Sequence, residues 1–157
     1  TDMIQQNAIT NIYKDDGQAM ITLANLPFSP QTIASVFSDI AAVGVKVDII
    51  SQTSPFNGRV GLSFSLPRAD LKRSLKQLEK FKKDGVEIIA TDALSKLTVE
   101  GPGMERQSGV AARLFGALAE KGIAISIITT SETKISFCVE SERSTEAVGI
   151  VASAFYL

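Results

Sequence analysis

Histidine is absent from the 157 residues of this chain, which limits the chemistry that the remaining side chains can do. Without histidine the sequence lacks the commonest general base and the commonest metal ligand. The turn Gly101-Pro102-Gly103 is followed by neither the dinucleotide-binding fingerprint nor the Gly-Lys-Ser/Thr ending of a phosphate-binding loop. We therefore expect no catalytic site, no metal and no cofactor in this chain.

The composition is that of an ordinary globular protein. Hydrophobic residues make up 45% of the chain, which is enough for one domain or two small packed ones. The 16 basic residues nearly balance the 17 acidic ones, and the one basic run, from Lys72 to Lys83, lies opposite a leucine stripe on a predicted helix. With no tryptophan and two tyrosines for base stacking, the sequence argues against a nucleic-acid partner.

Hydropathy and cysteine usage indicate a cytoplasmic protein. No apolar run approaches the roughly 20 residues that cross a bilayer, and residues 1–8 lack the apolar core of a signal peptide. The single cysteine, Cys138, cannot form an internal disulfide, and the alternating stretch around it predicts a buried thiol in a reducing compartment. We expect no membrane association.

The first half of the chain predicts the order βαββαβ. Apolar residues recur with helical spacing in two segments and alternate in the others, and Asn57-Gly58 is typical of a hairpin turn. Gly44 and Gly85 end the two helices. The predicted elements are a strand at 19–25, a helix at 33–41, strands at 45–49 and 60–66, a helix at 71–81 and a strand at 86–90.

The second half repeats this order up to its last strand. An offset of 78 residues superposes Phe37 on Phe115 and Gly44 on Gly122, which indicates a duplication. The predicted elements are a strand at 97–99, a helix at 111–118, strands at 123–127 and 135–139, and a helix at 147–155.

The fourth strand of the second repeat is missing, while residues 8–14 have strand character and no partner in the first repeat. We interpret residues 8–14 as that strand, so that one module comprises 15–92 and the other 8–14 plus 93–157. The fold class is then α+β, with two ferredoxin-like modules. Each module has a four-stranded antiparallel sheet with helices on one face, and the first is inserted in the second.

Five segments of the second half stand out as motifs: Gly101-Pro102-Gly103-Met104, Gly109-Val110-Ala111-Ala112-Arg113-Leu114-Phe115, Ala117-Leu118-Ala119-Glu120, Thr129-Thr130-Ser131-Glu132 and Lys134-Ile135-Ser136. With them, the second half resembles the second module of the paired ACT domains at the C-terminus of aspartate kinases, which are also made as separate regulatory subunits. The first half is similar but looser, and the resemblance covers about residues 8–156.

This resemblance implies feedback control of aspartate-family amino-acid biosynthesis. Lysine, threonine or both would bind between ACT modules, often across a homodimer, and inhibit a kinase domain that lies upstream or in another subunit. Nothing in the chain resembles the phosphate-binding or aspartate-binding segments of that kinase. The chain would then be a regulatory fragment or subunit, not itself an enzyme.

The resemblance also implies a set of effector-binding residues. The first turn of a helix near Gly109 would hold the α-carboxylate of an amino acid. Asp48 and Glu132 would neutralise an ammonium group, and the Ser131 hydroxyl would accept from the α-ammonium. Lysine then fits better than threonine. The full set is Asp48, Gln52, Met104, Gln107, Gly109, Val110, Ile125, Ser131 and Glu132.

The sequence departs from the family pattern at several of these places. Gln107-Ser108 replaces a usual His-Pro, Ala124 replaces an asparagine, and the cation Lys46 stands two residues before Asp48. In the first module a usual Asp-Lys-Pro-Gly loop reads Phe28-Ser29-Pro30-Gln31, which loses the carboxylate and the glycine. The altered loop weakens the case for a threonine-type site in the first module. Gln107-Ser108 makes the loop before Gly109 less rigid than the usual His-Pro, and the charge of Lys46 opposes a lysine ligand.

Other interpretations stay open beside these. Asp48 and Glu132 are equally typical of charges that protect strand edges, Ser131 of a hairpin turn, and Met104 of a core-capping residue. As a whole, the chain is also compatible with a structural dimerisation module without effector binding, or with a free-standing ACT sensor. Which effector binds, and how many molecules, does not follow from the sequence.

Overall fold

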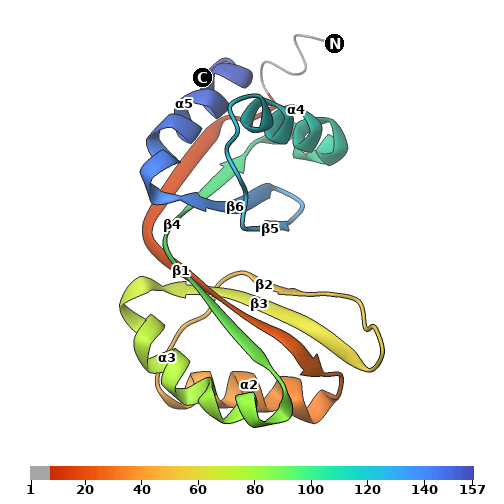
Figure 1. Cartoon of the computed structure of the whole chain (residues 1–157). Coiled ribbons are helices and arrows are strands. Elements are labelled where there is room, and N and C mark those ends of the chain that lie inside the picture. The colour runs from red at the N-terminus through yellow and green to blue at the C-terminus, as the bar shows by residue number, and fades with distance from the viewer. Residues whose placement is uncertain (1–7) are drawn as a thin grey trace. The chain divides into compact units, whose positions relative to one another are not determined.

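The computed structural model describes residues 8–157, apart from the side chains of residues 106 and 107. The internal contacts divide the chain into two compact units. One is the continuous unit, Gly17–Ala93; the other is the split unit, whose described part is residues 8–16 with Leu94–Leu157 (Figure 1). The hydrogen-bonded strand order is β2-β3-β1-β4-β6-β5, and strands β1 and β4 each contribute residues to both units.

The continuous unit combines four strands with two helices and confirms the predicted α+β class. Its pairing is antiparallel, with Ile21 of β1 opposite Phe64 of β3 and Ile50 of β2 also opposite Phe64. Helices α2 and α3 lie on the same side of these strands (Figure 1). The elements are β1 (Asn11–Pro27), α2 (Pro30–Ala42), β2 (Ile50–Gln52), β3 (Arg59–Pro67), α3 (Leu71–Leu78) and β4 (Glu87–Glu100).

Local sequence signals account for the turns of this unit. Asn57 and Gly58 have φ of 51° and 73°, as a two-residue turn between the bridged residues Phe56 and Arg59 requires. Helix α2 begins with Pro30 after Ser29, whose side chain accepts a hydrogen bond of 3.1 Å from the amide of Thr32. These turns set the register in which the apolar side chains of β1 and β3 face the helices.

Two predicted strands begin later than the sequence suggests. The alternation at 45–49 is not a strand, and β2 starts at Ile50 because the ladder is irregular just before it. The hydroxyl of Ser65, not its carbonyl, accepts from the amide of Ile49 at 2.9 Å. In the split unit, residues 123–126 are likewise outside β5.

Two pairs of predicted strands are continuous. Residues 11–27 form one strand, β1, and residues 87–100 form another, β4. Each strand passes from one unit to the other beside a residue in the left-handed region: Gly17 with φ 76° in β1 and Ala93 with φ 55° in β4. The Ala93 amide donates 2.7 Å to its neighbour Asp92, and Arg68 pairs with the same carboxylate at 2.6 Å.

The split unit repeats the same architecture. Strand β4 pairs antiparallel with β6, with Leu97 opposite Phe137, and β5 pairs with the other edge of β6. Cys138 of β6 is fully buried, as predicted. The remaining elements are a 3-10 turn (Pro102–Arg106), α4 (Gln107–Glu120), β5 (Ile127–Thr130), β6 (Lys134–Glu140), a 3-10 turn (Ser141–Arg143) and α5 (Ser144–Ala154).

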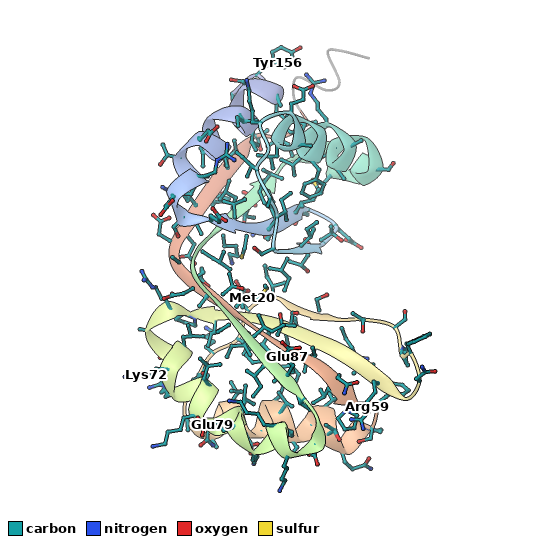
Figure 2. The ribbon with its side chains drawn as sticks, in the orientation of Figure 1. Met20, Arg59, Lys72, Glu79, Glu87 and Tyr156 are labelled. Carbon is teal, nitrogen blue, oxygen red and sulfur yellow. The ribbon has the colours of Figure 1, made fainter. Side chains whose placement is uncertain are left out.

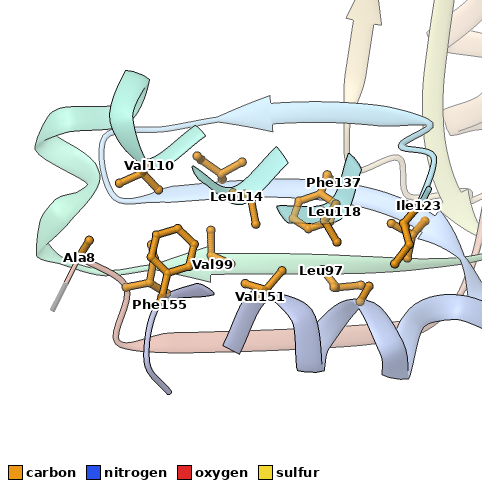
Figure 3. Packing of buried hydrophobic residues seen from close by; sticks show 14 of the residues in the cluster. Ala8, Leu97, Val99, Val110, Leu114, Leu118, Ile123, Phe137, Val151 and Phe155 are labelled. Carbon is orange, nitrogen blue, oxygen red and sulfur yellow. The ribbon is translucent and has the colours of Figure 1, made fainter. Parts of the chain in front are cut away.

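One apolar cluster fills the split unit. Val110, Leu114 and Leu118 of α4 meet Val151 of α5 and Phe137 of β6 there (Figure 3). Ala8 and Ile9 are buried in the same cluster, and the amide of Thr10 donates 2.9 Å to the carbonyl of Glu100. The assignment of residues 8–14 to this module stays a prediction, which these contacts support.

The basic run lies on α3 and on the 3-10 helix (Glu79–Asp84) that follows it, and its charges face solvent. Lys72 and Glu79 point away from the sheet (Figure 2), while Leu78 and Phe81 are buried against it. The remaining charges of the run are exposed. Arg73 pairs with Asp70, three residues before it, at 2.9 Å, and Lys80 pairs with Asp39 of α2 at 2.6 Å. Within residues 8–157 no helix has the length and apolar character to span a bilayer.

Candidate functional site

An open hollow of about 580 Å³ lies in the split unit where β4 ends and β6 begins. It brings together two residues of the predicted site, Met104 and Glu132, which are 28 positions apart in the sequence. Glu105 and Glu132 are both exposed there, so two carboxylates and no cation are found among the described lining residues. Those residues are Gly101, Pro102, Met104, Glu105, Glu132 and Thr133.

The first wall of the hollow is the turn that follows β4. The amide of Met104 donates 3.2 Å to the carbonyl of Gly101, which closes this turn. Met104 is 2% exposed and belongs to the apolar cluster, so its thioether packs in the core. The core-capping interpretation of Met104 therefore holds for its side chain, and only a small part of the residue faces the hollow.

The second wall is the turn between β5 and β6. Its backbone is fixed by the amide of Ser131, which donates 2.8 Å to the carbonyl of Lys134. The Ser131 hydroxyl accepts from the amides of Lys134 at 3.2 Å and Thr133 at 3.4 Å. Ser131 thus forms the turn, as one of the two interpretations expects, and the turn presents the carboxylate of Glu132 to solvent.

The first turn of α4 follows the first wall in the chain. Helix α4 begins at Gln107, four residues before the predicted helix at 111–118, and the side chain of Gln107 lies outside the described part of the structure. Gly109 is exposed, and a Cβ at this position would enter open space beside the helix. Val110 is buried in the cluster, so only its backbone is available. A 3-10 turn (Pro102–Arg106) runs directly into α4, whose dipole favours a carboxylate near its first turn.

The other predicted residues lie apart from this hollow. Ile125 is half-buried and packs against the apolar cluster of the split unit. Asp48 and Gln52 belong to the continuous unit, where both are exposed. The amide of Asp48 donates 3.1 Å to the carbonyl of Ser65, and Gln52 ends β2 opposite Leu62. A binding role for these three residues stays a prediction.

Sequence reasoning missed Glu100, the last residue of β4 before the glycine turn. Its carboxylate accepts from the hydroxyl of Tyr13 at 2.7 Å and from the side-chain amide of Asn11 at 3.2 Å, and it pairs with Lys134 at 3.6 Å. The hydrogen bond from Tyr13 holds the pKa of Glu100 below its ordinary value, and it raises the pKa of Tyr13. The i,i+2 spacing places Asn11 and Tyr13 on one face of β1, but nothing in the sequence marks Glu100 as their partner.

Comparison with known proteins assigns this architecture to a class. A protein-family model of the ACT domain matches residues 97–155. Aspartokinase 2 of Bacillus subtilis is 34% identical over 158 residues, which cover 98% of this chain and 38% of that protein. The regulatory subunit of aspartate kinase from Thermus thermophilus, in its ligand-free form, superposes with a TM-score of 0.85 at 32% identity, covering 94% of this chain and 99% of that one.

A chain in the crystal structure of aspartokinase alpha and beta subunits gives the same TM-score, 0.85, at 34% identity, with 95% of this chain and 99% of that one covered. The chain therefore belongs to the family of ACT-domain regulatory subunits and regulatory regions of aspartate kinases. It spans 38% of the length of the curated aspartokinases that it matches first.

Proposed function

We propose that this chain is the amino-acid-sensing part of an aspartate kinase, and that it binds lysine, threonine or both to impose feedback inhibition. The observation that carries the proposal is the hollow between the turn at 101–105 and the turn at 131–133, which two carboxylates line. Inhibition would act on a kinase domain upstream or in a partner subunit. A homodimer and a cytoplasmic location belong to the same proposal.

The charges around the hollow favour a ligand with a side-chain cation. Glu105 and Glu132 are exposed on its two walls, and the nearby ammonium of Lys134 is paired with Glu100. A carboxylate-ammonium hydrogen bond contributes about 1.5–3 kcal/mol, more than a neutral one. The α-carboxylate of the ligand would lie at the first turn of α4. Lysine is therefore the favoured effector.

The division into modules is part of the proposal. We assign residues 15–92 to one ACT module and residues 8–14 with 93–157 to the other. The burial of Ala8 and Ile9 among residues of α4, β4 and α5 supports this assignment, since the N-terminal segment thereby completes the core of the second module. Asp48 and Gln52 would contribute to effector binding from the first module.

One observation favours a second candidate, a structural dimerisation module that has lost its effector control. The first turn of α2, in the continuous unit, is already capped by Ser29, and Phe28 before it is 54% exposed. A helix start that its own side chain caps has less need of a ligand carboxylate. This candidate predicts that the chain self-associates without binding either amino acid.

Calorimetric titration with lysine and with threonine separates the two candidates. The proposal expects saturable lysine binding that weakens by about tenfold or more in Glu132→Gln, because one charge-assisted contact is lost. Asp48→Ala tests the contribution of the first module. Glu79→Gln, an exposed carboxylate on the basic face of the continuous unit, is the control and should bind lysine like the unmodified chain. An absence of binding to both amino acids would favour the dimerisation module.

A further inference from the structure

We propose that residues 8–13 respond to the effector site: a ligand bound in the hollow changes how tightly this N-terminal segment is held against the rest of the split unit. The inference rests on the proposed function, and it names the route by which that function would be exerted. Neither the ACT-domain match, which begins at residue 97, nor the predicted site residues include this segment.

The first step is a direct backbone contact between the segment and one wall of the hollow. The amide of Gly103 donates 2.8 Å to the carbonyl of Ala8. A Cβ on Gly101 would lie 2.7 Å from the Cα of Ile9 and 2.8 Å from the amide nitrogen of Thr10, and one on Gly103 would overlap Ala8. The two glycines thus let the turn lie against the segment with no side chain between them.

The second step is the core beneath this contact. Ala8 and Ile9 are 5% and 0% exposed, and Ala8 lies at the same end of the apolar cluster as Val110 and Phe155 (Figure 3). Val110 belongs to the first turn of α4, where we place the ligand carboxylate. A shift of that turn should therefore displace Ala8 as well, since close-packed interiors transmit small displacements.

The third step is Glu100, which links the segment to the other wall. Its carboxylate accepts hydrogen bonds from the Tyr13 hydroxyl and the Asn11 side-chain amide of the segment, and it forms an ion pair with Lys134. Lys134 follows the wall residues Glu132 and Thr133 and is bonded through its carbonyl to Ser131. Glu100 also lies opposite Lys134 in the β4–β6 ladder, so the N-terminal segment is attached to the strand ends from which both walls of the hollow extend.

This arrangement gives a reciprocal coupling. A ligand that holds the walls together should disfavour the local opening of residues 8–13. A change that loosens the segment should reduce the affinity for the ligand by the same factor. The contacts form a contiguous physical network, which is the requirement for testing such a coupling by substitution.

Hydrogen exchange of the whole 157-residue chain, with and without saturating lysine, tests the inference. We expect the amides of residues 9–13 and of Gly103 to exchange at least about fivefold more slowly with lysine, in the usual range of coupling between sites. If lysine binds by calorimetry and slows exchange at 101–105 while residues 9–13 are unchanged, the inference is wrong and the proposed function stands. If neither amino acid binds, the proposed function itself fails.

A substitution outside the hollow provides the reciprocal test. Tyr13→Phe removes the hydroxyl that donates to Glu100 but keeps the ring, and it should reduce the affinity for lysine by about fivefold. It should also speed exchange at Gly103 and Lys134 in the ligand-free chain, a readout that needs no ligand. Tyr156→Phe, at another exposed tyrosine of the same unit, is the control and should change neither. Unchanged affinity and unchanged exchange in Tyr13→Phe would overturn the inference.

Discussion

The hydroxyl of Tyr13 lies 2.7 Å from Oε1 of Glu100, although the two residues are 87 positions apart in the sequence. This hydrogen bond favours the ionised carboxyl and the neutral phenol, so it lowers the pKa of Glu100 and raises the pKa of Tyr13. The bond therefore makes the stability of the split unit depend on pH at both ends of the range.

For Glu100 the dependence falls on the acid side. Because its pKa is lower in the folded chain than the ordinary 4.5, its contribution is complete above about pH 4.5 and is lost as the pH falls through the folded value. We expect urea unfolding to show a smaller loss of stability between pH 7 and pH 3.5 in Glu100→Gln than in the unmodified chain. Equal losses in the two proteins would contradict the assignment.

The close approach of Gly103 to Ala8 predicts a costly substitution. Gly103→Ala should destabilise the chain by about 2 kcal/mol or more, because a Cβ there meets backbone that cannot move aside cheaply. Gly149→Ala in α5 is the matched control. Its Cβ would enter open space, and the higher helix propensity of alanine should stabilise the chain by about 0.5–1 kcal/mol. Chemical denaturation of both variants measures the difference.

Ala93, with φ 55°, predicts a stabilising substitution to glycine. The left-handed conformation costs a residue with a Cβ about 1–2 kcal/mol, and the greater entropy of unfolded glycine offsets about 0.5–1 kcal/mol of the gain. We expect Ala93→Gly to raise the free energy of unfolding by about 0.5–1 kcal/mol. Ala90→Gly, in the same strand, lacks positive φ and should lower it; a loss of stability in both variants would show that Ala93 is not strained.

The two repeats predict equivalent core positions. Phe64 pairs with Phe37 and Phe137 with Phe115, each with ring centroids 5.7 Å apart, and both Phe64 and Phe137 are fully buried. Phe64→Ala and Phe137→Ala should each cost about 3–5 kcal/mol. Phe56→Ala, at a ring that is 77% exposed, should be nearly neutral in the same thermal or urea unfolding experiment.

The sequence predicted the order of elements because the apolar periodicity is strong and occurs twice, so each half supports the interpretation of the other. It placed the starts of β2 and β5 too early because alternation persists in extended chain that lacks a regular ladder. The amide of Ile49 donates to the side-chain hydroxyl of Ser65 instead of to a backbone carbonyl, and the spacing of apolar residues does not predict such a bond. Local patterns specify which residues are apolar, but not where hydrogen bonding begins.

The candidate site was predictable only in part for a related reason. Turn residues such as Ser131 and Glu132 could be found by their types and by resemblance. Glu100 could not, because its partners Asn11 and Tyr13 are brought near by the pairing of segments almost 90 positions apart. The role of Gly101 and Gly103 was likewise hidden, since a turn and a close backbone approach use the same residue type.

The burial of Cys138 gives the chain an internal chemical probe. Its thiol is the sole one in the sequence and is fully buried in β6, where no reagent reaches it in the closed fold. Alkylation must wait until the structure that covers β6 of the split unit opens, so the labelling rate reports the population of that opened form. An effector that stabilises this unit would therefore protect the thiol, and amino acids could be ranked by the delay they cause without attaching any dye or tag.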